Sequence, residues 1–226
     1  MTPPPTRVRR GNYDIVVAGF CALLLISNIG ATKLIEFGPI ITDGGAFLFP
    51  LTYILGDVLA EVYGLRRARR AIVLGFALSI IASLTFLLVL ISPPAADWPK
   101  QEAWEAVLGF VPRIVAASLV GYLAGQLLNA WVLVKIKQRT GERSLWARLI
   151  GSTLVGEAAD TVLFCTIAFA GEVSGATLLN YIAVGYFYKV LVEALLLPIT
   201  YRVVALVRAH EPDDVLAEAV PPVQRA

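Results

Sequence analysis

The sequence predicts an all-α membrane protein with six transmembrane helices. Charged residues make up only 16% of its 226 residues and apolar residues 58%, whereas a water-soluble domain carries about 25% charged residues. Uncharged stretches such as 72–91 are long enough to cross a hydrocarbon core about 30 Å thick, which takes about 20 apolar residues. The distribution of Lys and Arg between the connecting segments agrees with this helix count.

The six apolar segments divide the chain into a membrane domain and two tails. The first segment resembles a secretory signal because arginines precede it, but five further spans favour an uncleaved first helix. We expect a disordered basic tail over 1–13, a six-helix transmembrane domain over 14–207 and a polar tail over 208–226. The predicted spans are 14–32, 46–63, 71–92, 109–134, 147–170 and 180–207.

The positive charges predict the orientation of the chain. With the connections numbered alternately from the N-terminus, fifteen Lys and Arg residues fall on the side that holds both termini. Three, Lys33, Lys100 and Arg113, fall on the other side, and Lys189 lies within the sixth span. Cytoplasmic loops carry the excess of Lys and Arg. Both termini are therefore predicted to be cytoplasmic.

The connection between the first two helices is more than a simple turn. Residues 33–45 combine β-branched residues with Gly38-Pro39 and Gly44-Gly45. This composition favours a short hairpin or a re-entrant loop. Non-helical backbone at membrane depth is tolerated only where it is buried in protein or faces a cavity.

Six ionisable residues fall within the predicted spans. Each charged side chain at a helix centre costs about 2.5–3.5 kcal/mol on insertion scales, so such groups must be paired, protonated or in contact with a watery cavity. Pairing between helices is the structural alternative, and Lys189 can neutralise one carboxylate in that way. A functional role is the default interpretation for the set as a whole. The six residues are Asp57, Glu61, Glu157, Asp160, Lys189 and Glu193.

Polar residues on several spans share helix faces. Residues three or four apart lie on the same side of a helix, so these faces should converge on one interior. Like charges in such a site raise one another's pKa, and shared protons favour a proton-coupled carrier. The shared faces are Tyr53–Asp57–Glu61, Thr153–Glu157–Asp160–Thr161, Lys189–Glu193, Tyr122–Gln126–Asn129 and Asn28–Thr32.

Two weaker patterns concern symmetry and packing. Gly56-Asp57 with Glu61, and Gly156-Glu157 with Asp160, lie one hundred residues apart at equivalent places in two three-helix halves. Because three is an odd number of helices, the two halves would insert into the membrane with opposite orientations. The match is therefore compatible with the 3+3 inverted repeat of secondary transporters. The spacings Ala18-x-x-x-Ala22 and Gly121-x-x-x-Gly125 allow close helix packing, within the bundle or at a homodimer seam.

Several partners and cofactors are not expected. A net charge of +2 gives no support for a nucleic-acid partner. Cys21 and Cys165 lie in apolar segments and indicate neither a disulfide nor a metal site, and the single histidine, His210, lies in the polar tail. The phosphate-binding pattern Gly-x-x-x-x-Gly-Lys is absent from the sequence, so no ATP hydrolysis and no cofactor are predicted.

Two long segments carry a family resemblance. The runs Ser27 to Lys33 and Asp43 to Gly64, followed by clustered arginines, resemble the queuosine precursor transporter family, a group also described as vitamin-uptake transporters. Gly156 to Thr161 and the Tyr188 to Glu193 neighbourhood look similar as well, and the resemblance covers about 12–208. It implies a multi-pass protein of the bacterial inner membrane that imports 7-deazaguanine bases, the cyano- and aminomethyl-substituted precursors of queuosine, as a secondary carrier.

The implied substrate suggests roles for the polar and aromatic residues. A guanine-like edge presents an N–H beside an exocyclic amine, and one carboxylate can accept both. We assign this role to Glu157 or Asp160, with Asp57 and Glu61 next. Amides would pair with the remaining polar atoms of the base and aromatic rings would stack on its face. The complete predicted site is Asn28, Phe49, Tyr53, Asp57, Glu61, Gln126, Asn129, Glu157, Asp160, Tyr186, Lys189 and Glu193.

Two other functions are compatible with parts of the sequence. Six short helices and the Ala18-x-x-x-Ala22 spacing also resemble the substrate-binding subunit of ATP-driven vitamin importers, which binds but does not transport alone. An intramembrane aspartyl protease would use Asp57 and Asp160, but Ile54 stands where its Gly-x-Gly-Asp pattern needs the first glycine. The expected partners are the substrate, membrane lipid and, for so small a carrier, a second copy of the chain.

Overall fold

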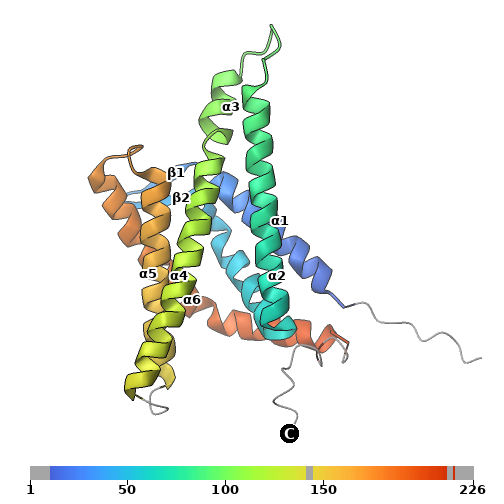
Figure 1. Ribbon diagram of the computed structural model, residues 1–226, viewed down its shortest axis with the longest axis vertical. Helices are drawn as coiled ribbons and strands as arrows, with labels where there is room; N and C mark the ends of the chain where they lie inside the picture. Colours follow the sequence, from blue (N-terminus) through green and yellow to red (C-terminus); the bar gives the residue numbers. More distant parts are fainter. Residues whose placement is uncertain (1–10, 141–144, 213–215, 217–226) are drawn as a thin grey trace, which may run out of the picture.

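The computed structural model describes residues 11–140, 145–212 and 216 and is predominantly helical (Figure 1). Five of its helical stretches are long and apolar enough to cross a membrane: Tyr13–Gly30, Phe49–Ile91, Gln101–Ile136, Ile150–Phe169 and Gly175–His210. The chain is therefore a helical membrane protein, as predicted. The long helices are α1 (Tyr13–Gly30), α2 (Phe49–Ile91), α4 (Val111–Thr140), α5 (Leu145–Phe169) and α6 (Gly175–His210).

Helix α2 contains both the second and the third predicted spans, and it is broken between them. Gly64 has φ 81° and ψ 160° inside α2, a backbone conformation that glycine adopts without steric cost. In Figure 1 the chain descends along the part before Gly64 and ascends along the part after it. We call these parts the first arm (49–63) and the second arm (65–91) of α2.

The segment between α1 and α2 folds back on itself. Strands β1 (Leu34–Phe37) and β2 (Ile40–Asp43) pair antiparallel, with Leu34 opposite Asp43 and Phe37 opposite Ile40. Gly38, in the turn, has φ 60°. A 3-10 helix, η1 (Gly44–Phe47), leads into α2. A hairpin therefore connects α1 to the first arm of α2.

Buried apolar residues form two clusters, one in each half of the bundle. The first lies between α1 and α2, and Val203, Val204 and Val207 from the end of α6 pack against it. The second lies between α4, α5 and the beginning of α6. Helices α4 and α5 approach closely at Gly125, where an added Cβ would lie 2.9 Å from the Gly156 carbonyl oxygen. The small-residue spacing on α4 thus serves packing within the bundle.

The remaining elements close the two ends of the bundle. A short helix, α3 (Gln101–Leu108), precedes α4. At the other end, α6 extends three residues beyond its predicted span, to His210, and Glu211 is only 6% exposed. Its Oε1 accepts hydrogen bonds from the Asn12 backbone N–H and the Tyr63 hydroxyl, both at 2.7 Å. The other predicted tail residues, 1–10, 213–215 and 217–226, lie outside the described residues.

Candidate functional site

Two cavities lie between the halves of the bundle. The hairpin chamber, about 240 Å³, lies beside β2 and η1 and is lined from α1, α2, α4, α5 and α6. The carboxylate chamber, about 500 Å³, lies between both arms of α2 and helices α4 and α5. Phe49, Thr52, Tyr122 and Asp160 line both. These four side chains form the layer between the chambers.

The carboxylate chamber brings together polar groups that are distant in sequence. Asp57 comes from the first arm of α2, Asn129 from α4, and Glu157 and Asp160 from α5. Because residues three apart share a helix face, Glu157 and Asp160 both face the chamber. Arg69, from the second arm of α2, lines it as well. Acidic and amide side chains on three helices therefore meet around one hollow.

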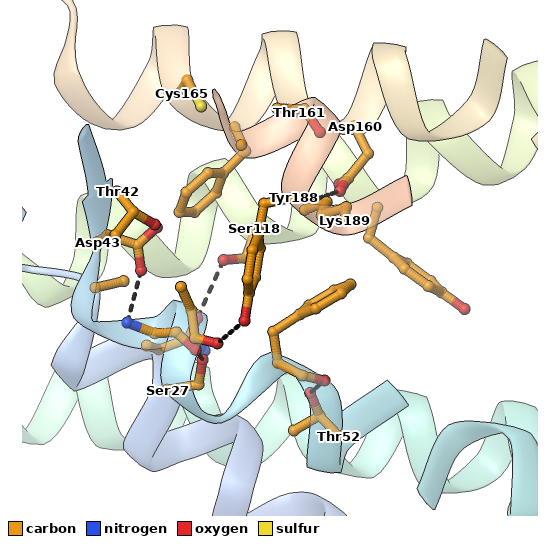
Figure 2. Close-up of a pocket in the computed structure, with 18 of the residues that line it drawn as sticks. Ser27, Thr42, Asp43, Thr52, Ser118, Asp160, Thr161, Cys165, Tyr188 and Lys189 are labelled. Atoms are coloured by element: carbon orange, nitrogen blue, oxygen red, sulfur yellow. Dashed lines mark hydrogen bonds and ion pairs between the residues drawn. The ribbon is translucent and has the colours of Figure 1, made fainter. Parts of the chain in front are cut away.

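Lys189 on α6 places a positive charge next to the carboxylates of α5. Its ammonium group donates a hydrogen bond to Asp160 Oδ2 and lies 3.9 Å from Glu157 Oε2. The side chains of Lys189, Asp160 and Glu157 are only 19%, 23% and 25% exposed. The ammonium also lies 5.6 Å from the centre of the Phe49 ring, within the range of a cation–π interaction. Lys189 thus joins α6 to α5 at the layer between the chambers (Figure 2).

Two buried acceptor atoms in the carboxylate chamber lack a hydrogen-bond donor among the described residues, although one of them, Glu157 Oε2, lies within ion-pair distance of Lys189. Glu157 Oε2 and Asn129 Oδ1 are buried and accept no hydrogen bond from the described part of the chain. They lie on facing helices, since a Cβ added at Gly156 would come 2.9 Å from Asn129 Cβ. Buried polar atoms are nearly always paired in folded proteins. Two acceptors without hydrogen-bond donors in one chamber are therefore suited to a ligand edge that presents such donors.

The hairpin chamber is closed by contacts between the hairpin and α6. Asp43 accepts hydrogen bonds from the Gly45 N–H at 2.6 Å and from the Tyr181 hydroxyl. Tyr188 donates to the Ala46 carbonyl at 2.8 Å. Burial raises the pKa of the Asp43 carboxyl above its usual value, although the hydrogen bonds from Tyr181 and Gly45 act in the opposite direction. Sequence reasoning missed Asp43 because it lies in a connection outside the spans.

The structure gathers most of the predicted site residues around the two chambers. Nine line one or both: Asn28, Phe49, Tyr53, Asp57, Gln126, Asn129, Glu157, Asp160 and Lys189. Asn28 is already engaged, since it donates to Ser79 Oγ and accepts from Ser118 Oγ. Its amide holds α1, α2 and α4 together, which reduces its capacity to bind a ligand.

Three predicted residues, Glu61, Tyr186 and Glu193, line neither chamber. Glu61 is exposed and its carbonyl accepts from Arg208, while Glu193 interacts with the Tyr53 hydroxyl. Tyr186 packs against Phe187, whereas Tyr188, two positions later, lines the hairpin chamber. A rotation of two residues moves a helical side chain by about 200°. The sequence alone did not show which of the two tyrosines, Tyr186 or Tyr188, faces the chamber.

Comparison of the sequence with known protein families identifies the family of this chain. The family described as "Putative vitamin uptake transporter" matches residues 43–203, which is most of the described chain. The chain belongs to this family. The matched region begins at Asp43, the last residue of β2, and contains the helices that carry the carboxylates and Lys189. Both chambers are thus built largely from the part of the chain that defines the vitamin uptake transporter family.

Individual relatives carry more specific names. The "Probable queuosine precursor transporter" of Bacillus subtilis (strain 168) is 33% identical over 178 residues, 77% of each chain. The "Queuosine precursor transporter" of Escherichia coli (strain K12) is 34% identical over 128 residues, 57% of this chain and 55% of the relative. A Haemophilus influenzae protein, also named "Probable queuosine precursor transporter", is 26% identical over 220 residues, 95% of this chain and 88% of the relative. No solved structure matches the chain significantly.

The comparisons bear on the class of function. The family and all three relatives are described as transporters, not as enzymes. The aspartyl-protease interpretation finds no support among them. The chain thus belongs to a family of transporters.

Proposed function

We propose that this protein imports 7-deazaguanine bases, the precursors of queuosine, across the bacterial inner membrane as a secondary carrier. The observation that carries the proposal is the meeting of carboxylate and amide acceptors from α4 and α5 in one aromatic-walled chamber, in a chain related to proteins named queuosine precursor transporters. Ligand pockets of this kind combine apolar and aromatic walls with a few placed polar groups.

The two acceptors without hydrogen-bond donors suit the donor edge of a guanine-like base. Glu157 Oε2 and Asn129 Oδ1 would accept from the ring N–H and the exocyclic amine. Phe49, Tyr53 and Tyr122 supply ring faces on which the base stacks. A base lacking those donors leaves both acceptors unpaired, and such sites reject analogues strongly. Adenine, which has no ring N–H at this edge, is thus expected to be excluded.

The membrane arrangement is part of the proposal. Counting the two arms of α2 separately gives six spans, with both termini in the cytoplasm and the arginine-rich break of α2 on the same side. The two apolar clusters correspond roughly to the two three-helix halves of a 3+3 inverted repeat. The exposed residues Ala18 and Ala22 on α1 offer a surface on which a second copy could pack.

The proposal is tested by uptake in cells that neither make nor import queuosine precursors, with queuosine in tRNA as the readout. Glu157→Gln should reduce uptake about 10- to 100-fold, because a hydrogen bond to a charged group contributes about 1.5–3 kcal/mol. Replacing Glu157 and Asp160 together with Gln and Asn should abolish uptake. Glu102→Gln on α3, an exposed residue outside both chambers, is the matched control. Normal uptake by the double variant at normal membrane abundance would refute the assignment.

A second experiment separates a carrier from a binding subunit. The purified protein, reconstituted alone in sealed vesicles, should accumulate or equilibrate 7-cyano-7-deazaguanine without ATP. Binding without translocation would instead favour the substrate-binding subunit of an ATP-driven importer. A proton gradient imposed on the same vesicles tests proton coupling directly.

A further inference from the structure

One fully buried hydroxyl group in the hairpin chamber lacks a hydrogen-bond partner within the described part of the chain. Thr161 on α5 is 2% exposed, and its Oγ1 has no partner among the residues that the structure describes. The residue lines the hairpin chamber directly after Asp160. Figure 2 shows Thr161, Asp160 and Cys165 on one wall of this chamber, with Thr52 on the opposite wall.

Neighbouring hydroxyl groups of the same chamber are satisfied within the protein. Ser27 donates to the Gly45 carbonyl, Ser118 to the Asn28 side chain, and Thr52 to the Phe49 carbonyl. Leaving a buried hydroxyl unpaired costs about 1–3 kcal/mol. Thr161 therefore destabilises the empty protein in a way that its neighbours do not. A ligand that supplies the missing partner would recover this free energy.

The walls around Thr161 indicate what kind of ligand fits. Six aromatic rings line the hairpin chamber: Phe49, Phe76, Tyr122, Phe164, Tyr181 and Tyr188. Its volume of about 240 Å³ lies just below the usual range of ligand pockets, about 300–1,000 Å³. Such a space accommodates one planar heteroaromatic base. Thr161 also lies one helical turn beyond Glu157 on the same side of α5.

We propose that the hairpin chamber is a second binding position for the transported base, and that the Thr161 hydroxyl is the hydrogen-bonding group that holds it there. The proposal rests on the transport function proposed above. A base that leaves Glu157 in the carboxylate chamber passes Asp160 and reaches Thr161 one turn along α5. Thr161 thereby contributes to specificity, because a ring without a polar atom at this edge leaves the hydroxyl unpaired.

The test compares Thr161→Val, Thr161→Ser and Thr85→Val with the unmodified protein, all purified in detergent. Valine has the shape of threonine without the hydroxyl, whereas serine keeps it. Thr85 is an exposed residue of α2 whose hydroxyl already donates to Ile81 at 2.8 Å, so its change to valine is the matched control. The readouts are the melting temperature without ligand and the affinity for 7-cyano-7-deazaguanine.

Opposite effects on stability and binding are expected for Thr161→Val. The melting temperature without ligand should rise, since a methyl group replaces an unpaired buried hydroxyl. The affinity should fall about 3- to 10-fold, the equivalent of one hydrogen bond. Thr161→Ser should retain most of the affinity, and Thr85→Val should bind as the unmodified protein does.

The outcomes distinguish the two proposals. If Thr161→Val binds the base as tightly as the unmodified protein, the hydroxyl is satisfied by water or by rearrangement, and the second binding position is refuted. If Thr161→Ser loses as much affinity as Thr161→Val, the effect comes from packing and the hydrogen-bonding role is refuted. If the unmodified protein binds no 7-deazaguanine, the proposed function itself fails.

Discussion

The ion pair between Lys189 and Asp160 gives the sharpest prediction about stability. It joins α6 to α5 at the layer between the chambers, and its two side chains are 19% and 23% exposed. Removing the amine deprives two carboxylates, those of Asp160 and Glu157, of the positive charge of Lys189. In the unmodified protein Glu157 Oε2 lies 3.9 Å from the ammonium nitrogen. The variant Lys189→Met keeps the length and apolar stem of the side chain and removes only the charge and its hydrogen bonds.

The size of the effect follows from burial. Breaking a fully buried ion pair by removing one partner costs about 3–5 kcal/mol. Since about a fifth of each side chain here remains exposed, we expect the lower end, about 3 kcal/mol, for Lys189→Met. In a chain of this length about 3 kcal/mol corresponds to a melting temperature lower by roughly 6–12 °C. Asp160→Asn should cost less, because Lys189 retains Glu157 as a partner.

A double-mutant cycle measured by thermal unfolding in detergent tests this reasoning. Lys189→Met combined with Asp160→Asn should be more stable than the sum of the single effects predicts, with a coupling of about 2 kcal/mol between directly interacting residues. The exposed ion pair Arg113–Glu172, with side chains 34% and 50% exposed, is the comparison. Glu172→Gln should cost less than about 1 kcal/mol. Strictly additive single effects at 189 and 160 would refute the interpretation of this pair as an interdependent unit.

Two further predictions concern the hairpin. An added Cβ at Gly44 would lie 2.5 Å from the Gly30 carbonyl oxygen, whereas at Gly175 it would meet nothing within 4 Å. Gly44→Ala should therefore lower the free energy of unfolding by about 1–3 kcal/mol, and Gly175→Ala should leave it nearly unchanged. Equal melting temperatures of the two variants would contradict the close approach of Gly44 to Gly30. Because burial raises the folded-state pKa of Asp43, the folded protein binds more protons than the unfolded chain, so this carboxyl makes stability fall as pH rises from its ordinary pKa to the raised value. Asp43→Asn should flatten that part of the pH–stability profile, and an unchanged slope would show that Asp43 does not titrate abnormally.

Apolar run length and charge placement predicted the helices well. The first span was expected over 14–32 and α1 covers Tyr13–Gly30; the sixth was expected over 180–207 and α6 covers Gly175–His210. The hydrocarbon core demands such long apolar runs, which makes the pattern strong. The ends were less accurate, because helix ends depend on local capping. Ser174, for example, caps α6 by accepting from the Thr177 N–H, which starts the helix five residues before the apolar run.

The candidate site was predicted less completely than the helices. Helical spacing places Asp57, Glu157 and Asp160 on inward faces, and all three line the carboxylate chamber. The partner of Lys189 did not follow from the sequence: the i, i+4 spacing drew attention to Glu193, whereas the ammonium contacts Asp160 on another helix. Contacts between helices depend on their mutual rotation, which one sequence does not specify. Thr161 was missed as a site residue for the same reason, whereas Asp43 was missed because it lies in a connection outside the spans.

The elbow at Gly64 has a consequence for how the bundle can move. Both arms of α2 meet at this one glycine, and the preceding Tyr63 is hydrogen-bonded to Glu211 directly after α6. The same helix α6 carries Lys189. A shift of α6 along its length would therefore pull at once on the ion pair beside the chambers and on the pivot between the arms. Through this linkage, a substrate bound in the chambers would affect the contact between Glu211 and Tyr63 at the end of α6.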